Sequence, residues 1–238
     1  DLDLASRVLA EAQKVQRHAG APAWDDACTA RTEGELFLRQ GDAERAVRLA
    51  RSTLASARSP RSRARLLNLL GIASATVGSL ADAIEAFREE LPALTQAGME
   101  TFIGTTHGNL AEAYLLAGDA ARAARNQLRA LEEARSNRDS IQVALSVLVA
   151  ARLASSRGEA AQAVELQTAA QLVLTEAGFV LYDTDRAYAD ELLVAARAAL
   201  GPERLAVAEQ QGSEIGLAVA ADVAEAVLGD GTVFPSTD

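Results

Sequence analysis

The segment LLNLLGIASATVGSLADAIEAF, residues 66–87, decides the fold of this chain. Its first half places apolar residues four and seven positions apart, as at Leu66, Leu70 and Ala73, which is the spacing of one face of an α-helix. Gly78 interrupts this pattern, and helical spacing resumes after it towards Phe87. The segment therefore predicts two amphipathic helices joined by a tight turn.

The same turn occurs four times along the chain. Its glycines are spaced by 37, 40 and 40 residues, at Gly41, Gly78, Gly118 and Gly158. The residue five positions after each glycine is always alanine, namely Ala46, Ala83, Ala123 and Ala163. A small residue at a fixed distance after a fixed turn indicates that two helices meet there at close range. The chain is therefore predicted to be a series of antiparallel helical hairpins.

This pattern resembles the tetratricopeptide repeat, whose turn glycine and small second-helix residue match the positions above. An earlier small position of that family falls on Gly34, Gly71, Ala111 and Ala151. Its first-helix aromatic falls on Phe37 and Tyr114, and its second-helix aromatic falls on Phe87, with Ala50, Gln127 and Gln167 at the equivalent positions. The family's signature Trp and late Pro are missing. The resemblance implies an all-α fold, a tetratricopeptide-like antiparallel helical-hairpin solenoid of about five repeats with a C-terminal capping helix.

Both ends of the sequence extend the array. Residues 2–19 carry small and apolar residues at the spacing of a second helix, so we expect an orphan half-repeat there. Gly201 and Ala206 repeat the turn spacing and predict a degenerate fifth hairpin over about 184–211. A last helix, over about 213–228, is expected to cover the apolar face of that hairpin.

These patterns divide the chain into three parts. Residues 1–178 are the predicted repeats, residues 179–228 the fifth repeat with its capping helix, and residues 229–238 a flexible tail. The sequence does not begin with Met. We therefore expect it to be a fragment or a processed product of a longer protein.

The charge balance limits the classes of partner that the chain is expected to bind. Lys and Arg number 23 and Asp and Glu number 33, for a net charge of −10, so the phosphate backbone of a nucleic acid is repelled on average. The longest apolar stretches, such as residues 215–221, fall far short of the roughly 20 residues that a membrane span needs. A single cysteine, Cys28, fits a reducing cytoplasm. Binding of nucleic acid or insertion into a membrane is therefore not expected.

No catalytic motif is found in the sequence. A phosphate-binding loop needs glycines before its lysine, whereas the single lysine, Lys14, lies in a helical pattern without them. The two histidines, His18 and His107, have no metal-ligand spacing with Cys28. We expect His107 to be a core or half-buried residue and Cys28 to be a buried or groove-edge thiol. The pairs Glu89-Glu90 and Glu132-Glu133 are expected to be solvated. The chain is thus predicted to be no enzyme and to bind no cofactor or metal.

The segment from Leu200 to Leu228 carries a second resemblance. Its run LGPERLAVA, residues 200–208, followed by an Ala-rich helix, looks like the closing segment of large actinobacterial LuxR-type transcription regulators. Those proteins combine a nucleotide-binding switch domain with a long tetratricopeptide-like region. The resemblance implies a bacterial, cytoplasmic sensor domain that binds a protein, a peptide or a small effector. A free-standing scaffold and an accessory domain of a signalling enzyme are the alternatives.

The tetratricopeptide resemblance also implies where a ligand binds. In that family the first helices line a concave groove, and the matching polar positions here are Arg31, Glu35, Arg65, Asn68, Asn109, Glu112 and Arg152. Arginines and asparagines on one wall can hold a carboxylate and hydrogen-bond an extended peptide. We therefore expect these residues to form one polar strip, while an ordinary solvated face is the alternative.

Overall fold

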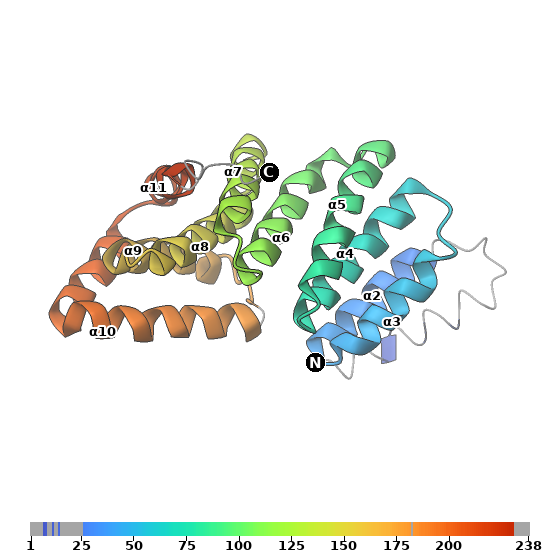
Figure 1. Cartoon of the computed structure of the whole chain (residues 1–238), viewed down its shortest axis with the longest axis horizontal. Coiled ribbons are helices and arrows are strands. Elements are labelled where there is room, and N and C mark those ends of the chain that lie inside the picture. Colours follow the sequence, from blue (N-terminus) through green and yellow to red (C-terminus); the bar gives the residue numbers. More distant parts are fainter. Residues whose placement is uncertain (1–6, 9–10, 12–13, 15–25, 182, 231–238) are drawn as a thin grey trace. The chain divides into compact units, whose positions relative to one another are not determined.

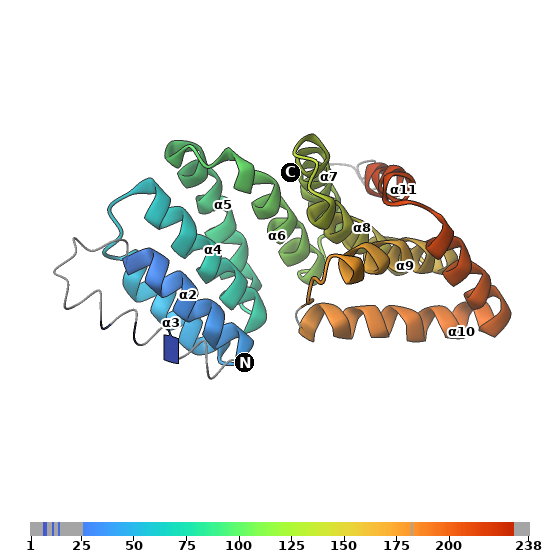
Figure 2. The same cartoon turned by 180° about the vertical axis from the view of Figure 1, so that it is seen from behind.

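The structure is a computed structural model, which describes residues 7–8, 11, 14, 26–181 and 183–230. Within these residues the chain is helical and contains no strand (Figures 1 and 2). The elements are α2 (Asp26–Arg39), α3 (Ala43–Leu54), α4 (Pro60–Thr76), α5 (Leu80–Ala97), the 3-10 helix η1 (Glu100–Phe102), α6 (Ile103–Leu116), α7 (Ala120–Ser136), α8 (Ser140–Ser156), α9 (Ala160–Glu176), α10 (Asp183–Glu214) and α11 (Leu217–Asp230). The predicted all-α class is confirmed.

The helices form two compact units, residues 1–113 and 114–238, with the boundary inside α6. In the first unit α2, α3, α4 and α5 pack in chain order, and α2 also packs on α4. In the second unit α7, α8, α9 and α10 do the same. Sequential packing of this kind is that of a helical solenoid. The division predicted from the sequence, at residues 178 and 228, stays a prediction.

The four predicted turns share one backbone geometry. Gly41, Gly78, Gly118 and Gly158 have φ between 79° and 82°, a left-handed conformation that glycine adopts without steric cost. The amide after each glycine donates to the carbonyl five residues earlier, as from Ser79 to Ser74 at 2.8 Å. This bond is that of a Schellman motif, which ends the first helix of each hairpin.

The alanine five residues after each turn lies at a closed helix–helix contact. Ala46, Ala83, Ala123 and Ala163 are all fully buried. The earlier small position behaves in the same way, because a Cβ atom on Gly71 would lie 2.4 Å from the ring of Phe87. The predicted contact between the two helices of a hairpin is therefore confirmed for α2 with α3, α4 with α5 and α8 with α9.

The prediction of the fifth hairpin is confirmed only in part. Gly201, with φ 74° and ψ 169°, breaks α10 into two helices at the predicted turn. Ala206, however, is exposed, and Leu205 and Ala208 are the buried residues of that segment. The second half of α10 therefore packs through a different face from the one that the turn spacing predicted.

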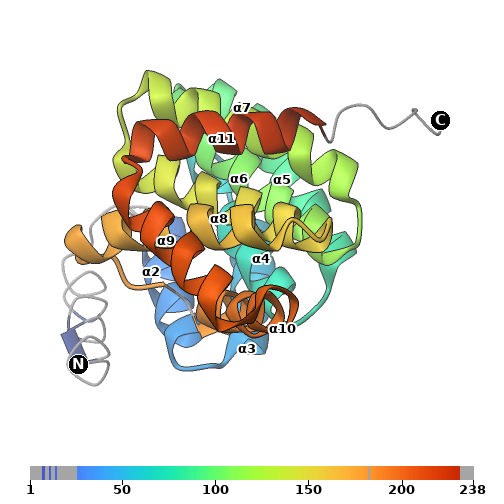
Figure 3. The ribbon, with the colours of Figure 1, turned by 90° about the vertical axis from the view of Figure 1, so that its left-hand side faces the viewer.

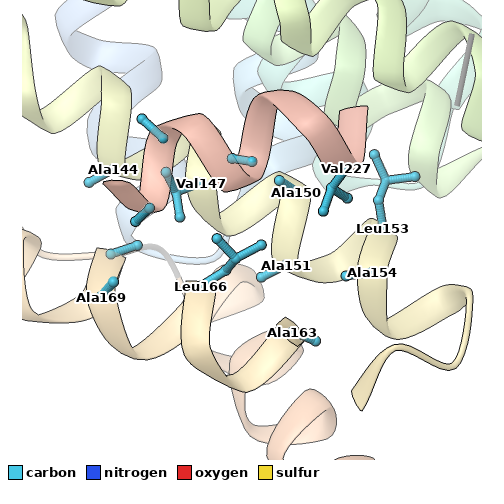
Figure 4. Packing of buried hydrophobic residues seen from close by; sticks show 14 of the residues in the cluster. Ala144, Val147, Ala150, Ala151, Leu153, Ala154, Ala163, Leu166, Ala169 and Val227 are labelled. Carbon is cyan, nitrogen blue, oxygen red and sulfur yellow. The ribbon is translucent and has the colours of Figure 1, made fainter. Parts of the chain in front are cut away.

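The last helix forms, but it packs elsewhere. α11 lies against α8, α7 and α9 (Figure 3), and not on the fifth hairpin as predicted. Its buried residues are Ala220, Ala221, Ala224, Val227 and Leu228, and they join the apolar cluster of the second unit (Figure 4). The predicted half-repeat at 2–19 lies almost wholly outside the described residues, as does the predicted tail from residue 231 onwards.

No helix in the described part of the chain is long and apolar enough to cross a membrane.

Replacing Ala83 or Ala123 by Leu tests the close contacts. Both alanines are fully buried, so the larger side chain overpacks the contact, and the free energy of unfolding should fall by roughly 1–3 kcal/mol. Urea denaturation followed by circular dichroism measures this change. Ala81→Leu, on the exposed face of α5, is the matched control. Unchanged stability in both buried variants would contradict the repeat register.

Candidate functional site

The first unit buries a carboxyl group, that of Glu90 on α5. Only 2 % of Glu90 is exposed, so the expectation that the pair Glu89-Glu90 is solvated is wrong for this residue. Glu89 is exposed, as expected, and its carboxylate lies 3.7 Å from the guanidinium of Arg63. Glu90 lies three residues after the buried Phe87 and four before the buried Leu94. Its position on that apolar stripe was the signal that could have revealed its burial.

Polar groups from three other helices act on the Glu90 carboxyl group. Asn68 of α4 donates from Nδ2 to Oε2 of Glu90 at 3.3 Å, Thr106 of α6 is hydrogen-bonded to the same side chain, and Arg31 of α2 contributes a positive charge. Burial raises the pKa of Glu90 from 4.5 to about 7, although these three neighbours lower it. The carboxyl group can therefore gain or lose a proton near neutral pH.

Thr106 makes a second hydrogen bond besides the one to Glu90. Its side chain is fully buried, and its hydroxyl donates to the carbonyl oxygen of Phe102 at 3.1 Å. A hydroxyl group has one proton to donate but can accept two hydrogen bonds. The single Thr106 proton is therefore shared between this carbonyl and Glu90, and the net effect of Thr106 is to lower the pKa of Glu90.

Two further donors of this unit are buried without a partner. They are Nε of Arg31 and Nδ2 of Asn109. Asn109 follows Thr106 by three residues, so both lie on the same side of α6. The terminal nitrogen of Arg31 lies 4.0 Å from the carboxylate of Glu35, which in turn lies 3.4 Å from Nε of Arg39. The ion pairs thus engage the end of the Arg31 side chain and leave its Nε–H group available.

Arg65 and Cys28 contact each other on the same unit. Nη1 of Arg65 donates to the Cys28 sulfur, and Cys28 is half-buried, as predicted for a buried or groove-edge thiol. His107, with 8 % of its surface exposed, is a core residue as predicted. Arg65 is therefore held in place by α2, the helix that also carries Arg31.

Not all of the predicted strip comes together in one unit. Arg31, Glu35, Arg65, Asn68 and Asn109 belong to the first unit, together with the half-buried Glu112. Arg152 belongs to the second unit, where its guanidinium carbon lies 3.9 Å from the ring centroid of Tyr188. A cation–π contact of this kind already engages Arg152. A continuous strip that includes Arg152 stays a prediction.

The arrangement in the first unit offers hydrogen-bond donors and one exchangeable proton. The N–H groups of Arg31 and Asn109 could donate hydrogen bonds to an oxygen acceptor. Glu90 can donate a hydrogen bond when it is protonated and only accept one when it is ionised. Among the described residues, no group of three or more His, Cys, Asp or Glu side chains could hold a metal ion. We call Glu90 together with Arg31, Asn68, Thr106 and Asn109 the Glu90 site.

Glu90 makes stability depend on pH. Its pKa is raised in the folded chain to about 7, so between about pH 4.5 and 7 the folded state keeps a proton that the unfolded state has lost. Stability should therefore decrease as the pH rises, by up to about 3 kcal/mol for a shift of this size. Glu90→Gln removes this titration, and the variant should be about as stable as the wild type near pH 4.5 and more stable at about pH 8.

Urea denaturation across this pH range measures the difference between Glu90→Gln and the wild type. The matched control is Glu89→Gln, which changes an exposed neighbour and should leave the pH profile of the wild type unchanged. If the difference between Glu90→Gln and the wild type does not grow with pH, Glu90 is ionised in the folded chain at neutral pH.

Comparison with known proteins bears on the fold alone. No family model matches the chain, and no curated protein matches it significantly. Among solved structures, the chain is similar to the crystal structure of BtubC (BKLC) from P. vanneervenii, with a TM-score of 0.57 and 18 % sequence identity. The similarity covers 100 % of this chain and 93 % of that one. The two proteins thus share a fold over nearly their whole lengths.

Proposed function

We propose that the chain is a non-enzymatic binding domain that holds an oxygen-acceptor group of a protein, peptide or small effector at the Glu90 site. One observation carries this proposal, namely the two buried and unpartnered N–H groups on Arg31 and Asn109. A buried donor without a partner costs roughly 1–3 kcal/mol. A ligand that supplies acceptors to both groups recovers that free energy when it binds.

A carboxylate is the acceptor that this surrounding favours. Arg31 and Arg65 bring positive charge to α2 and α4, and hydrogen bonds from arginine to a carboxylate are stronger than those to a neutral oxygen. A peptide C-terminus or an acidic side chain provides such a group. A neutral Glu90 strengthens this preference, because it does not repel a second carboxylate.

The wider setting that we propose is a tetratricopeptide-like sensor region of a bacterial transcription regulator in the cytoplasm. The regular turns and closed alanine contacts support the repeat type, and the segment at 200–228 supports the regulator. In this setting the chain binds neither nucleic acid nor a cofactor itself, and ligand binding alters a switch domain elsewhere in the protein. The sequence preceding Asp1 in the gene tests this setting, which requires a nucleotide-binding loop there.

Peptide binding tests the Glu90 site directly. Random peptides with a free C-terminal carboxylate are selected on the full chain, and the binders are titrated by fluorescence anisotropy. The double variant Arg31→Lys with Asn109→Ala should weaken binding at least about tenfold, since each lost hydrogen bond to a charged group is worth roughly 1.5–3 kcal/mol. Its thermal stability should not fall, because the two removed donors have no partner in the free chain.

Arg88→Lys, an exposed change on α5, is the matched control and should bind like the wild type. Amidated versions of the selected peptides should bind more weakly wherever the C-terminus is the recognised group. Equal binding by the double variant and the control would place the ligand away from the Glu90 site.

The absence of catalysis and of DNA binding is a separate prediction. With a net charge of −10, the chain should produce no salt-sensitive shift of duplex DNA at micromolar concentration. Its ATP hydrolysis should not exceed that of a matched control preparation, since the sequence has no phosphate-binding loop. A reproducible positive result in either assay would contradict the proposed non-enzymatic role.

A further inference from the structure

α11 packs on its neighbouring helices through one apolar stripe. Its buried residues Ala220, Ala221, Ala224, Val227 and Leu228 follow the spacing of i, i+1, i+4, i+7 and i+8, which is one stripe along a helix. The opposite face, with Val219, is exposed. Recognition of an amphipathic helix through such a stripe is a recurring mode of peptide binding.

The surface beneath α11 is built for a helix with small side chains. α8 contributes Ala144, Val147, Ala150 and Ala154, which are buried in the same cluster as the α11 stripe. Figure 4 shows Val227 of α11 beside Ala150 and Leu153 of α8. Alanines on both sides let the two helix axes approach closely, so larger side chains at the positions of Ala220, Ala221 and Ala224 would not fit.

Two arginines hold α11 at defined positions. Arg135 of α7 forms ion pairs of 2.6 Å with both Asp222 and Glu225, one from each terminal nitrogen. Arg157, just after α8, donates from Nη1 to the carbonyl oxygen of Val227 at 2.7 Å. Its Nη2 is buried without a partner. The surface therefore selects an acidic pair three residues apart and a helix whose last turn lies near Arg157.

α11 is joined to α10 by a short link. Ile215 and Gly216 are the two residues between the helices, and a Cβ atom on Gly216 would meet nothing within 4 Å. α11 packs on α7, α8 and α9, and the hairpins of these helices pack with each other through separate contacts. The hairpins therefore keep their contacts with each other when α11 is displaced.

We propose that this face of α7, α8 and α9 is a helix-docking site whose resident occupant is α11. The partner that it fits is a protein presenting an amphipathic helix with a stripe of small apolar residues and an acidic pair three residues apart. α11 competes with that partner at the high effective concentration of a tethered segment. Binding of the partner therefore requires release of α11, which makes the occupancy of this site a regulated state.

A labelled peptide of residues 217–230, added to the full chain, tests the site. Ala224→Glu places a charge in the buried stripe and should release α11, so this variant should bind the peptide at least about tenfold more tightly than the wild type does. The matched control is Ala226→Glu, the same change on the exposed face of α11, which should bind like the wild type. Peptide binding measured by fluorescence anisotropy gives the ratio.

Charge reversal tests the specificity. A peptide with Asp222→Lys and Glu225→Lys should lose at least about tenfold in affinity for the Ala224→Glu chain and should regain it when that chain also carries Arg135→Glu. Equal binding of the peptide by Ala224→Glu and Ala226→Glu, or no binding by either, would overturn the proposal. Formation of dimers by the wild type without peptide would also overturn it and would assign the site to a second copy of the chain.

Native-state hydrogen exchange keeps the proposal testable if Ala224→Glu lowers the helix content of the whole chain. In the wild type, the α11 amides should exchange through an opening of lower free energy than the one that exposes the α8 amides. Exchange of α11 only together with α8, by global unfolding, would show that α11 is not released on its own.

Discussion

The closed contact between the two helices of a hairpin, seen for α2 with α3, α4 with α5 and α8 with α9, is the constraint on which the other features depend. A left-handed glycine ends one helix and sets the direction of the next, and an alanine five residues later allows the two to touch. Because this alanine is fully buried in all four hairpins, helix spacing is set by the smallest side chains available. Of the larger residues, Phe37 packs with residues of α3 and α4, and the ring of Phe87 lies against Gly71 within its own hairpin.

Glu90 is an exception within this repeated plan. Twelve residues after the turn glycine, the other three hairpins carry Thr53, Ala130 and Ala170, which are small and buried or half-buried. Glu90 places a long acidic side chain at that position. Asn68, Thr106 and Arg31 then supply the polar surroundings that a buried carboxyl group requires. The polar groups of these three residues thus act on the one acidic side chain among the four equivalent positions.

The sequence predicted local features well because their causes are local. The turn at Gly78 and the close helix–helix contact at Ala83 follow from residue type and spacing alone. The prediction that Glu90 is solvated was wrong because it rested on the charge of the side chain and not on its position on an apolar stripe. Ala206 was assigned a contact that Leu205 and Ala208 make, since a turn fixes direction but not the rotation of the following helix. The place where α11 docks and the contact of Arg152 with Tyr188 depend on tertiary packing, which no short pattern specifies.

The raised proton affinity of Glu90 also changes what unfolding does to the solvent. At about pH 6 the folded chain holds a proton on this carboxyl group that the unfolded chain gives up. Unfolding near this pH therefore delivers that proton to the buffer. The heat absorbed on unfolding then contains the enthalpy with which the buffer takes up a proton, so this heat differs between buffers that hold the chain at the same pH and the same stability.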